Sequence, residues 1–285
     1  MPDDLDDDFV LDDTVAWSAD EHGAPSDLDD QPTPPSDPAS ASTSAPIKKR
    51  KRREKEKERK AKKRKFTESV ESIEQSIAAQ PPHALSRYIS SVQTKTFPKL
   101  SAIELGDFEI PEASIADTTS WTGPRTLDQL ADFIIKVLPA LHTRLSQKSR
   151  STGAPTLLFV TGAALRVVDV TRALKTKKLR GEKGGEVAKL FAKHFKLSEH
   201  VAYLKRTKVG AAVGTPGRIG KLLNETDALA ASALSHIILD VTFRDSKKRC
   251  LLDIPETRDE VFRGVLAGPK LLKAIREGKV QLVLF

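Results

Sequence analysis

Apolar residues follow two different spacings along the second half of the chain. From Leu127, apolar side chains recur three or four positions apart up to Leu145, which predicts an amphipathic helix. Residues 156–161 (TLLFVT) are instead a short, mainly apolar run with β-branched and aromatic members, as expected for a strand buried on both faces. Runs of these two kinds alternate up to the C-terminus.

This alternation predicts the fold class. Helices are expected over 67–77, 85–92, 127–145, 163–174 and 187–195, from 219 to 223, and over most of 261–275. Strands are expected over 156–161, 200–204, 209–213, 237–240 and 280–285. Strands separated by helices form βαβ units, in which a parallel sheet is covered on both faces. The sequence therefore predicts an α/β domain with a parallel sheet flanked by helices.

The first 65 residues differ in composition from the rest. Residues 1–47 contain 13 acidic residues and no Lys or Arg. A segment so charged and so poor in apolar residues cannot bury enough surface to offset the entropy of ordering, so we predict a disordered tail. The expected organisation is an acidic tail over 1–47, a Lys/Arg-rich strip over 48–65, a helical and irregular lead-in over 66–125, and the α/β domain over 126–285.

The Lys/Arg-rich strip reverses the sign of the charge, with 14 Lys or Arg against three Glu over 48–65. Such a cluster is typical of a nuclear localisation signal or a polyanion-binding strip, and its Glu and Lys spacing also suits a solvated helix. A solubilising charged linker is the alternative. The candidate import residues are Lys48, Lys49, Arg50, Lys51, Arg52, Arg53, Lys62, Lys63, Arg64 and Lys65.

The remaining chain is also basic. Subtracting both segments leaves 47 − 14 = 33 basic and 39 − 13 − 3 = 23 acidic residues over 66–285. With only two Trp and two Tyr, this charge favours contacts with phosphate over stacking on bases, so nucleic acid is the expected partner class. Cys250 is the only cysteine and no apolar run approaches the length of a membrane span. No disulfide, membrane span, metal site or cofactor is expected, since His194, His200 and His236 share no metal-ligand spacing.

The segment 214–219 (GTPGRI) directly follows the expected strand 209–213 and opens a helix. One interpretation is structural: Thr215 caps the helix, Pro216 suits its first turn, and Gly214 allows a tight exit from the strand. The other is functional, because the free N–H groups of a helix N-terminus are suited to bind a backbone phosphate. Both interpretations stay open, and the candidate RNA-binding residues are Thr215, Gly217 and Arg218.

Two basic clusters lie in loops of the α/β part. One consists of Lys175, Lys177, Lys178, Arg180 and Lys183, and the other of Arg244, Lys247, Lys248 and Arg249. Both are expected to follow strands, on the side of the sheet where open α/β domains bind ligands. Ordinary solvated loops are the alternative to our hypothesis that both clusters contact RNA.

A loop for binding nucleotide phosphates is missing from the sequence. ATP hydrolysis by P-loop proteins needs glycine-rich backbone around the phosphates, a Lys on them, and a Ser or Thr on magnesium. The corresponding pattern GxxxxGK[ST] does not occur in the chain. The best remnant is residues 122–126 (TGPRT), which is shortened and contains Pro124.

Several of these stretches resemble the first RecA-like domain of DEAD-box RNA helicases. Residues 214–219 match the TPGR motif with which these helicases hold the RNA backbone. Residues 237–240 lie where the family has the strand leading to Asp-Glu-Ala-Asp, and 157–165 lie at the place of its Pro-Thr-Arg-Glu-Leu motif. Residues 282–285 resemble the strand before the Ser-Ala-Thr motif. The resemblance implies a single RecA-like domain of the P-loop NTPase type.

Departures from the helicase pattern imply that the domain is not an active enzyme. Val241 and Phe243 stand where the helicases have their catalytic Glu and second Asp, and the chain is expected to lack the second RecA-like domain. Asp240 corresponds to a metal ligand in an active ATPase. Without a phosphate loop, we expect Asp240 to be a hydrogen-bonding residue of the loop instead.

One family combines these features, the Cms ribosomal-small-subunit proteins, and this chain is similar to them over roughly residues 85–285. The resemblance implies a non-catalytic nucleolar factor of the 90S pre-ribosome, or small-subunit processome, that is a monomer within a large ribonucleoprotein. It would bind pre-ribosomal or small nucleolar RNA and processome proteins through its helicase-like domain. The alternatives are a pure protein scaffold in the same particle and a nuclear protein that binds DNA or chromatin; a helicase enzyme is disfavoured by the missing phosphate loop.

Overall fold

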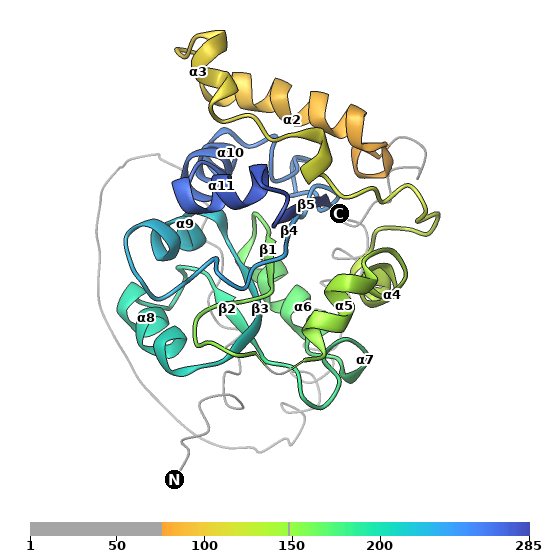
Figure 1. Ribbon diagram of the computed structural model, residues 1–285, viewed down its shortest axis with the longest axis vertical. Helices are drawn as coiled ribbons and strands as arrows, with labels where there is room; N and C mark the ends of the chain where they lie inside the picture. Colours follow the sequence, from red (N-terminus) through yellow and green to blue (C-terminus); the bar gives the residue numbers. More distant parts are fainter. Residues whose placement is uncertain (1–75, 148) are drawn as a thin grey trace, which may run out of the picture. The chain divides into compact units, whose positions relative to one another are not determined.

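The computed structural model describes residues 76–147 and 149–285, which are built around a parallel five-stranded sheet (Figure 1). The strand order is β2-β3-β1-β4-β5. Along the chain the strands are β1 (Leu157–Val160), β2 (Glu186–Leu190), β3 (Val209–Gly214), β4 (His236–Leu239) and β5 (Gln281–Leu284). All four strand pairings are parallel, so the predicted α/β class with a parallel sheet is confirmed.

Helices connect the consecutive strands. α6 (Ala164–Leu174) and α7 (Lys177–Arg180) lead from β1 to β2, α8 (Leu197–Arg206) leads to β3, and α9 (Pro216–Asn224) leads to β4. α10 (Pro255–Asp259), a π-helical segment (Glu260–Leu266) and α11 (Pro269–Arg276) precede β5. Because parallel strands all end on the same side, we call that side the carboxyl edge of the sheet, and the side where the strands begin the amino edge.

Two predicted elements of this region were wrong. Residues 187–195, expected to be helical, form most of β2 and the loop after it, and residues 200–204, expected to be a strand, lie in α8. The apolar side chains of β2 fit helical spacing, but pairing with β3 overrides that local pattern. In α8 the two buried side chains, His200 and Leu204, are four positions apart, which is the spacing of one helix face.

The sheet has a hydrophobic core on each face. Along β1, Leu157 and Phe159 pack in one core, whereas Leu158 and Val160 pack in the other. Successive side chains of a strand point to opposite faces, so this alternation is what a strand covered on both sides requires. α6 covers the first face, and α9 and α11 cover the second.

The predicted helix over 127–145 is broken into two helices. α4 (Leu127–Val137) and α5 (Pro139–Leu145) meet at Leu138, whose backbone leaves the helical region with φ −122° and ψ 58°. Pro139 causes the break, because proline lacks an N–H and excludes the helical conformation of the residue before it. Both helices still pack with α6 on the first face of the sheet.

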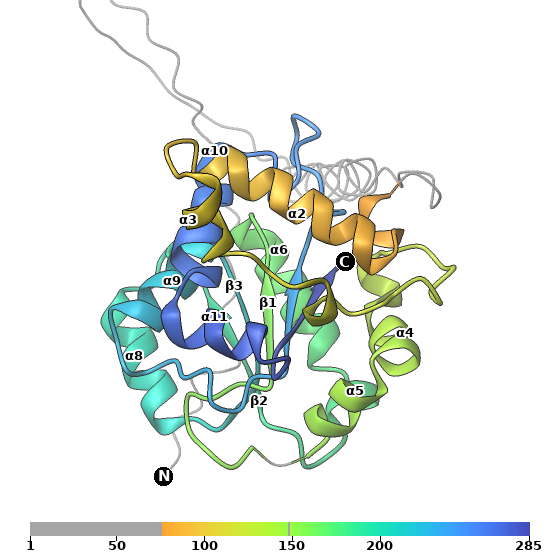
Figure 2. The same ribbon diagram turned by 45° about the horizontal axis from the view of Figure 1, so that its top comes forward.

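The lead-in to the α/β domain packs into the second core. α2 (Pro82–Thr96) buries Leu85, Ile89 and Val92 there, and it lies beside α3 (Ala102–Gly106) and α10 in both views (Figure 2). Two short 3-10 turns complete the lead-in, Ile77–Ala79 and Glu112–Ser114. Ile115 then forms a single parallel bridge with Leu282 of β5.

Three predicted segments lie outside the described residues. They are the acidic tail over 1–47, the Lys/Arg-rich strip over 48–65 and the first residues of the lead-in. Within 76–147 and 149–285, no helix has the length and apolar content needed to cross a membrane.

Candidate functional site

Asp240 lies at the carboxyl edge, directly after β4, and is completely enclosed. Its Oδ2 atom accepts hydrogen bonds from Thr161 Oγ1 at 2.9 Å and from Arg166 Nε at 2.9 Å. Arg166 Nη2 also approaches Oδ1, at 3.4 Å. Thr161 follows β1 and Arg166 lies in the first turns of α6, so adjacent strands bring the three side chains together. All three are buried.

This ion pair decides what Asp240 can do. The guanidinium of Arg166 lies beside the carboxylate, where it supplies the positive charge that a metal ion would otherwise provide, and Phe243 stacks on it with 4.8 Å between Cζ and the ring centroid. A buried carboxylate that already has two donors and a cation has little affinity left for magnesium. The expectation that Asp240 is a hydrogen-bonding residue agrees with this geometry.

The remnant of a phosphate loop, residues 122–126, is packed against neighbouring side chains of the protein. Arg125 Nη2 donates to Oγ1 of Thr118 at 2.9 Å and to its carbonyl at 3.2 Å, and the guanidinium stacks on Phe133. Burial lowers the pKa of Arg125 to about 10. A Cβ atom at Gly123 would lie 3.0 Å from the Trp121 ring, so this backbone is covered by an indole.

A P-loop normally lies between a strand and a helix. Here the segment directly before the remnant is not a strand but is linked to β5 by the bridge from Ile115 to Leu282, and α4 follows. Arg125 Nη1 reaches the carbonyl of Leu284 at 3.4 Å, which places a protein cation at the carboxyl end of β5. The remnant therefore lacks the preceding strand of a phosphate loop, and its arginine makes its contacts within the protein.

The segment 214–219 joins β3 to α9 at the carboxyl edge. Thr215 is the N-cap residue of α9, but its side chain makes no capping hydrogen bond, so that part of the structural interpretation is wrong. Gly214 packs against β2 so closely that a Cβ atom would lie 2.3 Å from the carbonyl oxygen of Leu190. Gly217 faces the carboxylate of Glu260, and a Cβ atom there would lie 2.4 Å from Oε1. The helix N-terminus thus already has a negative group beside it.

Arg218 points into the protein instead of along the edge. Its Nη2 donates to the carbonyl of Phe195 at 2.8 Å, and burial lowers its pKa. Nη1 of Arg218 and Nδ1 of His200 are both buried, and neither has a hydrogen-bond partner among the described residues. In this arrangement Arg218 braces the loop after β2, and the guanidinium is not presented on the surface as a phosphate ligand.

Two buried histidines make the stability of the fold depend on pH. Burial, followed by the positive charge of Arg218, lowers the pKa of His200 to about 4; burial, followed by Arg144, does the same for His236. Between pH 4 and 6.5 the unfolded chain binds protons that the folded chain does not, so the free energy of unfolding falls as the pH falls through this window. Each histidine is expected to contribute up to about 1.4 kcal/mol per pH unit.

Urea unfolding at pH 7, 6, 5 and 4.5 measures this dependence. His236→Gln removes one titrating group and is expected to flatten the slope. A wild-type stability that stays constant down to pH 4.5 would contradict the assignment of two buried neutral histidines.

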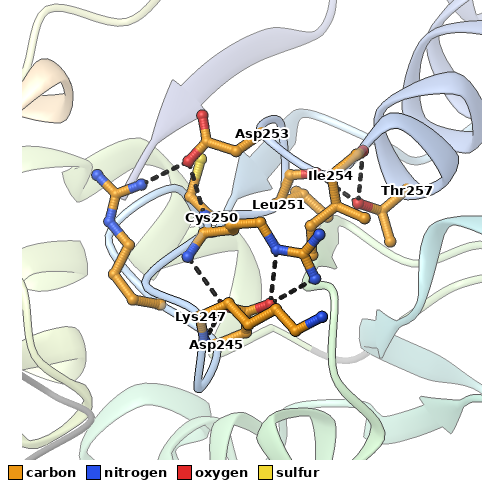
Figure 3. A network of polar contacts seen from close by, with 9 residues as sticks. Asp245, Lys247, Cys250, Leu251, Asp253, Ile254 and Thr257 are labelled. Atoms are coloured by element: carbon orange, nitrogen blue, oxygen red, sulfur yellow. Dashed lines mark hydrogen bonds and ion pairs between the residues drawn. The ribbon is translucent and has the colours of Figure 1, made fainter.

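The basic cluster at 244–249 lies at the carboxyl edge, in the loop after β4. Figure 3 shows the polar contacts around Asp245 and Asp253 in this loop. Arg244 pairs with Asp253 at 2.8 Å and Arg249 pairs with Asp245 at 2.9 Å. The Oδ1 atom of Asp245 also accepts the backbone N–H groups of Lys247 and Arg249, which makes a tight turn. Arg244 and Arg249 thus form ion pairs within the loop, whereas Lys247 and Lys248 are exposed.

The other basic cluster does not lie where it was expected. Residues 175–183 include α7 and lead from α6 towards the start of β2, at the amino edge, so the prediction that both clusters follow strands was wrong. The error arose because β2 was not recognised. The chain returns through α6 to the amino edge before the cluster begins. Lys178 pairs with Asp132, and Arg180 pairs with Glu186 at 2.8 Å.

A further pair of cations at the carboxyl edge was missed by the sequence analysis. Lys193 and Lys196 are exposed in the loop after β2, where His194 has the left-handed φ of 69°. Placing a helix over 187–195 hid this loop. The available signal was the string of cations and one histidine over 193–196. No group of three or more His, Cys, Asp or Glu residues that could hold a metal ion occurs in the part of the chain that the structure describes.

The chain is similar to several known proteins. Among solved structures, the yeast DEAD-box splicing factor Prp28 matches with a TM-score of 0.34 and 15% identity, over 60% of this chain and 35% of that chain. Protein CMS1 of Chaetomium thermophilum is 38% identical over 65% of this chain and 72% of its own length. Protein cms1 of Schizosaccharomyces pombe is 34% identical over 72% and 70%, and human Protein CMSS1 is 30% identical over 64% and 61%.

A family model matches nearly the whole sequence. Its description is CMS1, U3-containing 90S pre-ribosomal complex subunit, and the match extends over residues 30–285. This range includes the carboxyl edge, the lead-in and the Lys/Arg-rich strip. The chain therefore belongs to the CMS1 family of U3-containing 90S pre-ribosomal complex subunits.

Proposed function

We propose that this chain is a non-catalytic assembly factor of the early small-subunit pre-ribosome, and that its α/β domain (126–285) binds RNA and neighbouring proteins. The observation that carries the non-catalytic part is the buried ion pair between Arg166 and Asp240. In a nucleotide hydrolase this carboxylate would hold magnesium. Here it is used to fix the loops that follow β1 and β4.

Two further features support the absence of catalysis. The guanidinium of Arg125, in the remnant phosphate loop, is bound to Thr118 and Leu284, and Val241, which follows Asp240, is fully buried. An apolar side chain at Val241 cannot orient an attacking water. We expect no magnesium-dependent ATP hydrolysis above the background of a mock purification. Hydrolysis that disappears in Asp240→Asn would contradict the proposal.

RNA binding is proposed for the carboxyl edge. Four exposed lysines, Lys193, Lys196, Lys247 and Lys248, follow β2 and β4 there. Exposed ammonium groups suit the phosphate backbone, which supplies most sequence-independent affinity for nucleic acid. Membership of a family described as pre-ribosomal subunits makes pre-ribosomal or small nucleolar RNA the proposed ligand.

The remaining parts of the proposal concern location and partners. The strip 48–65 would direct import into the nucleus, and the assembled particle would hold the chain in the nucleolus as one copy within a large ribonucleoprotein. A pure protein scaffold in the same particle is the second candidate, favoured by the inward orientation of Arg218 and by Glu260 at the N-terminus of α9. DNA or chromatin binding is the third, because lysines on the surface do not distinguish DNA from RNA.

Salt-dependent RNA affinity separates these candidates. In the full chain, Lys193→Glu, Lys247→Glu and Lys248→Glu together (the carboxyl-edge variant) are expected to weaken binding of a pre-ribosomal RNA fragment. The slope of log affinity against log salt concentration is expected to become less steep by about 2 to 3. Each phosphate that is no longer neutralised accounts for roughly 0.7 to 0.9 of this slope. Lys95→Glu, Lys99→Glu and Lys270→Glu together form the control variant, with the same charge change on exposed residues elsewhere.

The outcomes differ for each candidate. No measurable RNA affinity of the wild type at low salt would favour the scaffold. Equal affinity for a DNA duplex of the same sequence would favour a DNA-binding protein. Equal weakening by the carboxyl-edge and control variants would contradict a defined RNA site at the carboxyl edge.

A further inference from the structure

The amino edge of the sheet gathers three loops that are distant in sequence. The connection 175–185 leads into β2, residues 205–208 lead into β3, and residues 149–153 approach β1. Backbone hydrogen bonds join them: the N–H of Gly153 donates to the carbonyl of Thr207 at 3.0 Å, and the N–H of Glu186 donates to the carbonyl of Lys208 at 2.9 Å. The three loops therefore form one continuous surface.

This surface is strongly basic. Its cations that form no ion pair with any described residue are Arg150, Lys175, Lys177, Lys183, Arg206 and Lys208, which we call the amino-edge cations. All are exposed except Lys175, which is half-buried. Glu182 is the only acidic residue within the three loops. Sequence order alone could not show this surface, because it combines one recognised cluster with cations from two other loops.

The amino edge and the carboxyl edge are too far apart to act as one electrostatic site. The six residues of β3 lie between them, which corresponds to about 20 Å at roughly 3.3 Å per residue. The Debye length at physiological ionic strength is about 8 Å, so exposed charges at the two edges are screened from each other. Helices also cover both faces of the sheet between the edges.

The chemistry of the amino edge fits a phosphate backbone better than a protein. A stable protein interface needs apolar or aromatic anchors near its centre. The exposed large hydrophobic side chains in the described part of the chain are Ile103 and Leu165, and both lie elsewhere, in α3 and in the first turn of α6. A surface of Lys and Arg without such an anchor is suited to the phosphate backbone, which is polyanionic and is bound independently of sequence.

We infer that the amino edge is a second RNA-backbone-binding surface, and that the domain joins two RNA segments, one at each edge of the sheet. This inference rests on the proposed RNA binding at the carboxyl edge and adds a second site to it. A factor with two opposed sites holds two segments of a folding RNA near each other without any chemistry, and binding at the second site benefits from the high effective concentration that the first creates.

A bridging assay with the full chain tests the inference. A short biotinylated RNA is held on beads, and a fluorescent RNA of the same sequence is captured when a protein molecule binds both. The amino-edge variant carries Lys177→Glu, Lys183→Glu and Lys208→Glu; the carboxyl-edge and control variants are those described above.

We expect both edge variants to bind the immobilised RNA but to capture at least about tenfold less fluorescent RNA than the wild type, since each has fewer cations to neutralise phosphates at one site. The control variant is expected to behave like the wild type.

Four results would overturn the inference, and they show which part of it fails. A wild type that binds no RNA means that the proposed function itself fails. A wild type that binds RNA but does not bridge, or an amino-edge variant that bridges normally, rejects the second site alone. Loss of binding to an acidic peptide but not to RNA in the amino-edge variant assigns the surface to an acidic protein partner. Unchanged thermal unfolding of each variant, and a monomeric wild type by light scattering, are the required controls.

Discussion

Replacing Asp240 with alanine is expected to lower the free energy of unfolding by about 3–5 kcal/mol. The substitution leaves the Arg166 guanidinium buried without its carboxylate, and an uncompensated buried charge is among the costliest defects that a single substitution creates. Thr161 is also left without its acceptor. If Asp240 were instead an unoccupied metal ligand of an ATPase, removing its charge would cost little or would stabilise the fold. Urea unfolding of the wild type and the variant measures the difference.

Two matched variants sharpen this test. Asp227→Ala removes an exposed carboxylate that pairs with Lys205 at 3.0 Å, and is expected to change stability by less than about 1 kcal/mol. The double variant Arg166→Met, Asp240→Leu replaces both charges with apolar groups, and is expected to recover much of the stability because no buried charge remains. A destabilisation by Asp240→Ala no larger than that by Asp227→Ala would show that the ion pair does not hold the loops together.

Gly214→Ala is expected to destabilise the fold by about 3 kcal/mol, whereas Gly217→Ala, three residues later in the same motif, is expected to cost less than about 1 kcal/mol. A Cβ atom at Gly214 would meet the backbone of Leu190 at 2.3 Å, and backbone in a sheet cannot move aside cheaply. A Cβ atom at Gly217 would meet the end of the exposed Glu260 side chain, which can rotate away. Thermal unfolding of both variants gives the comparison.

The result assigns separate roles to the two glycines. A destabilisation confined to Gly214→Ala means that the first glycine of the GTPGRI segment serves the packing of β3 on β2. The second glycine is then free to serve binding, and Gly217→Ala becomes a usable probe of RNA affinity at the N-terminus of α9. Equal destabilisation by both variants would mean that Glu260 is held rigidly against Gly217.

Four of the five strands of this fold could be predicted from the sequence, and β2 could not. β1, β3, β4 and β5 were placed within about two residues, because apolar β-branched runs of that length fit a strand buried on both faces. β2 was mistaken for a helix. It lies at the end of the sheet with Glu186 and Lys189 half-buried, so its pattern is not the uniformly apolar one of a central strand.

Errors at one element carried over to the site. Because β2 was missed, the cluster at 175–183 was placed at the carboxyl edge and the loop with Lys193 and Lys196 was not recognised. Arg166 could not be identified as the partner of Asp240, since the hydrogen bond joins residues 74 positions apart and depends on β1 lying beside β4. The contacts of Arg125 could not be predicted for the same reason, since the sequence around it shows only a degenerate phosphate loop.

In-cell UV crosslinking of the tagged full chain, with sequencing of the attached RNA and mass spectrometry of the crosslinked peptides, tests the central claim most directly. That claim is that a domain without a phosphate loop, and with Asp240 paired to Arg166, binds pre-ribosomal RNA without catalysis. It predicts crosslinks to pre-ribosomal or small nucleolar RNA at the peptides that carry Lys193 and Lys247. Small-subunit assembly factors recovered without RNA crosslinks, or crosslinks confined to the strip at 48–65, would contradict RNA binding by the domain.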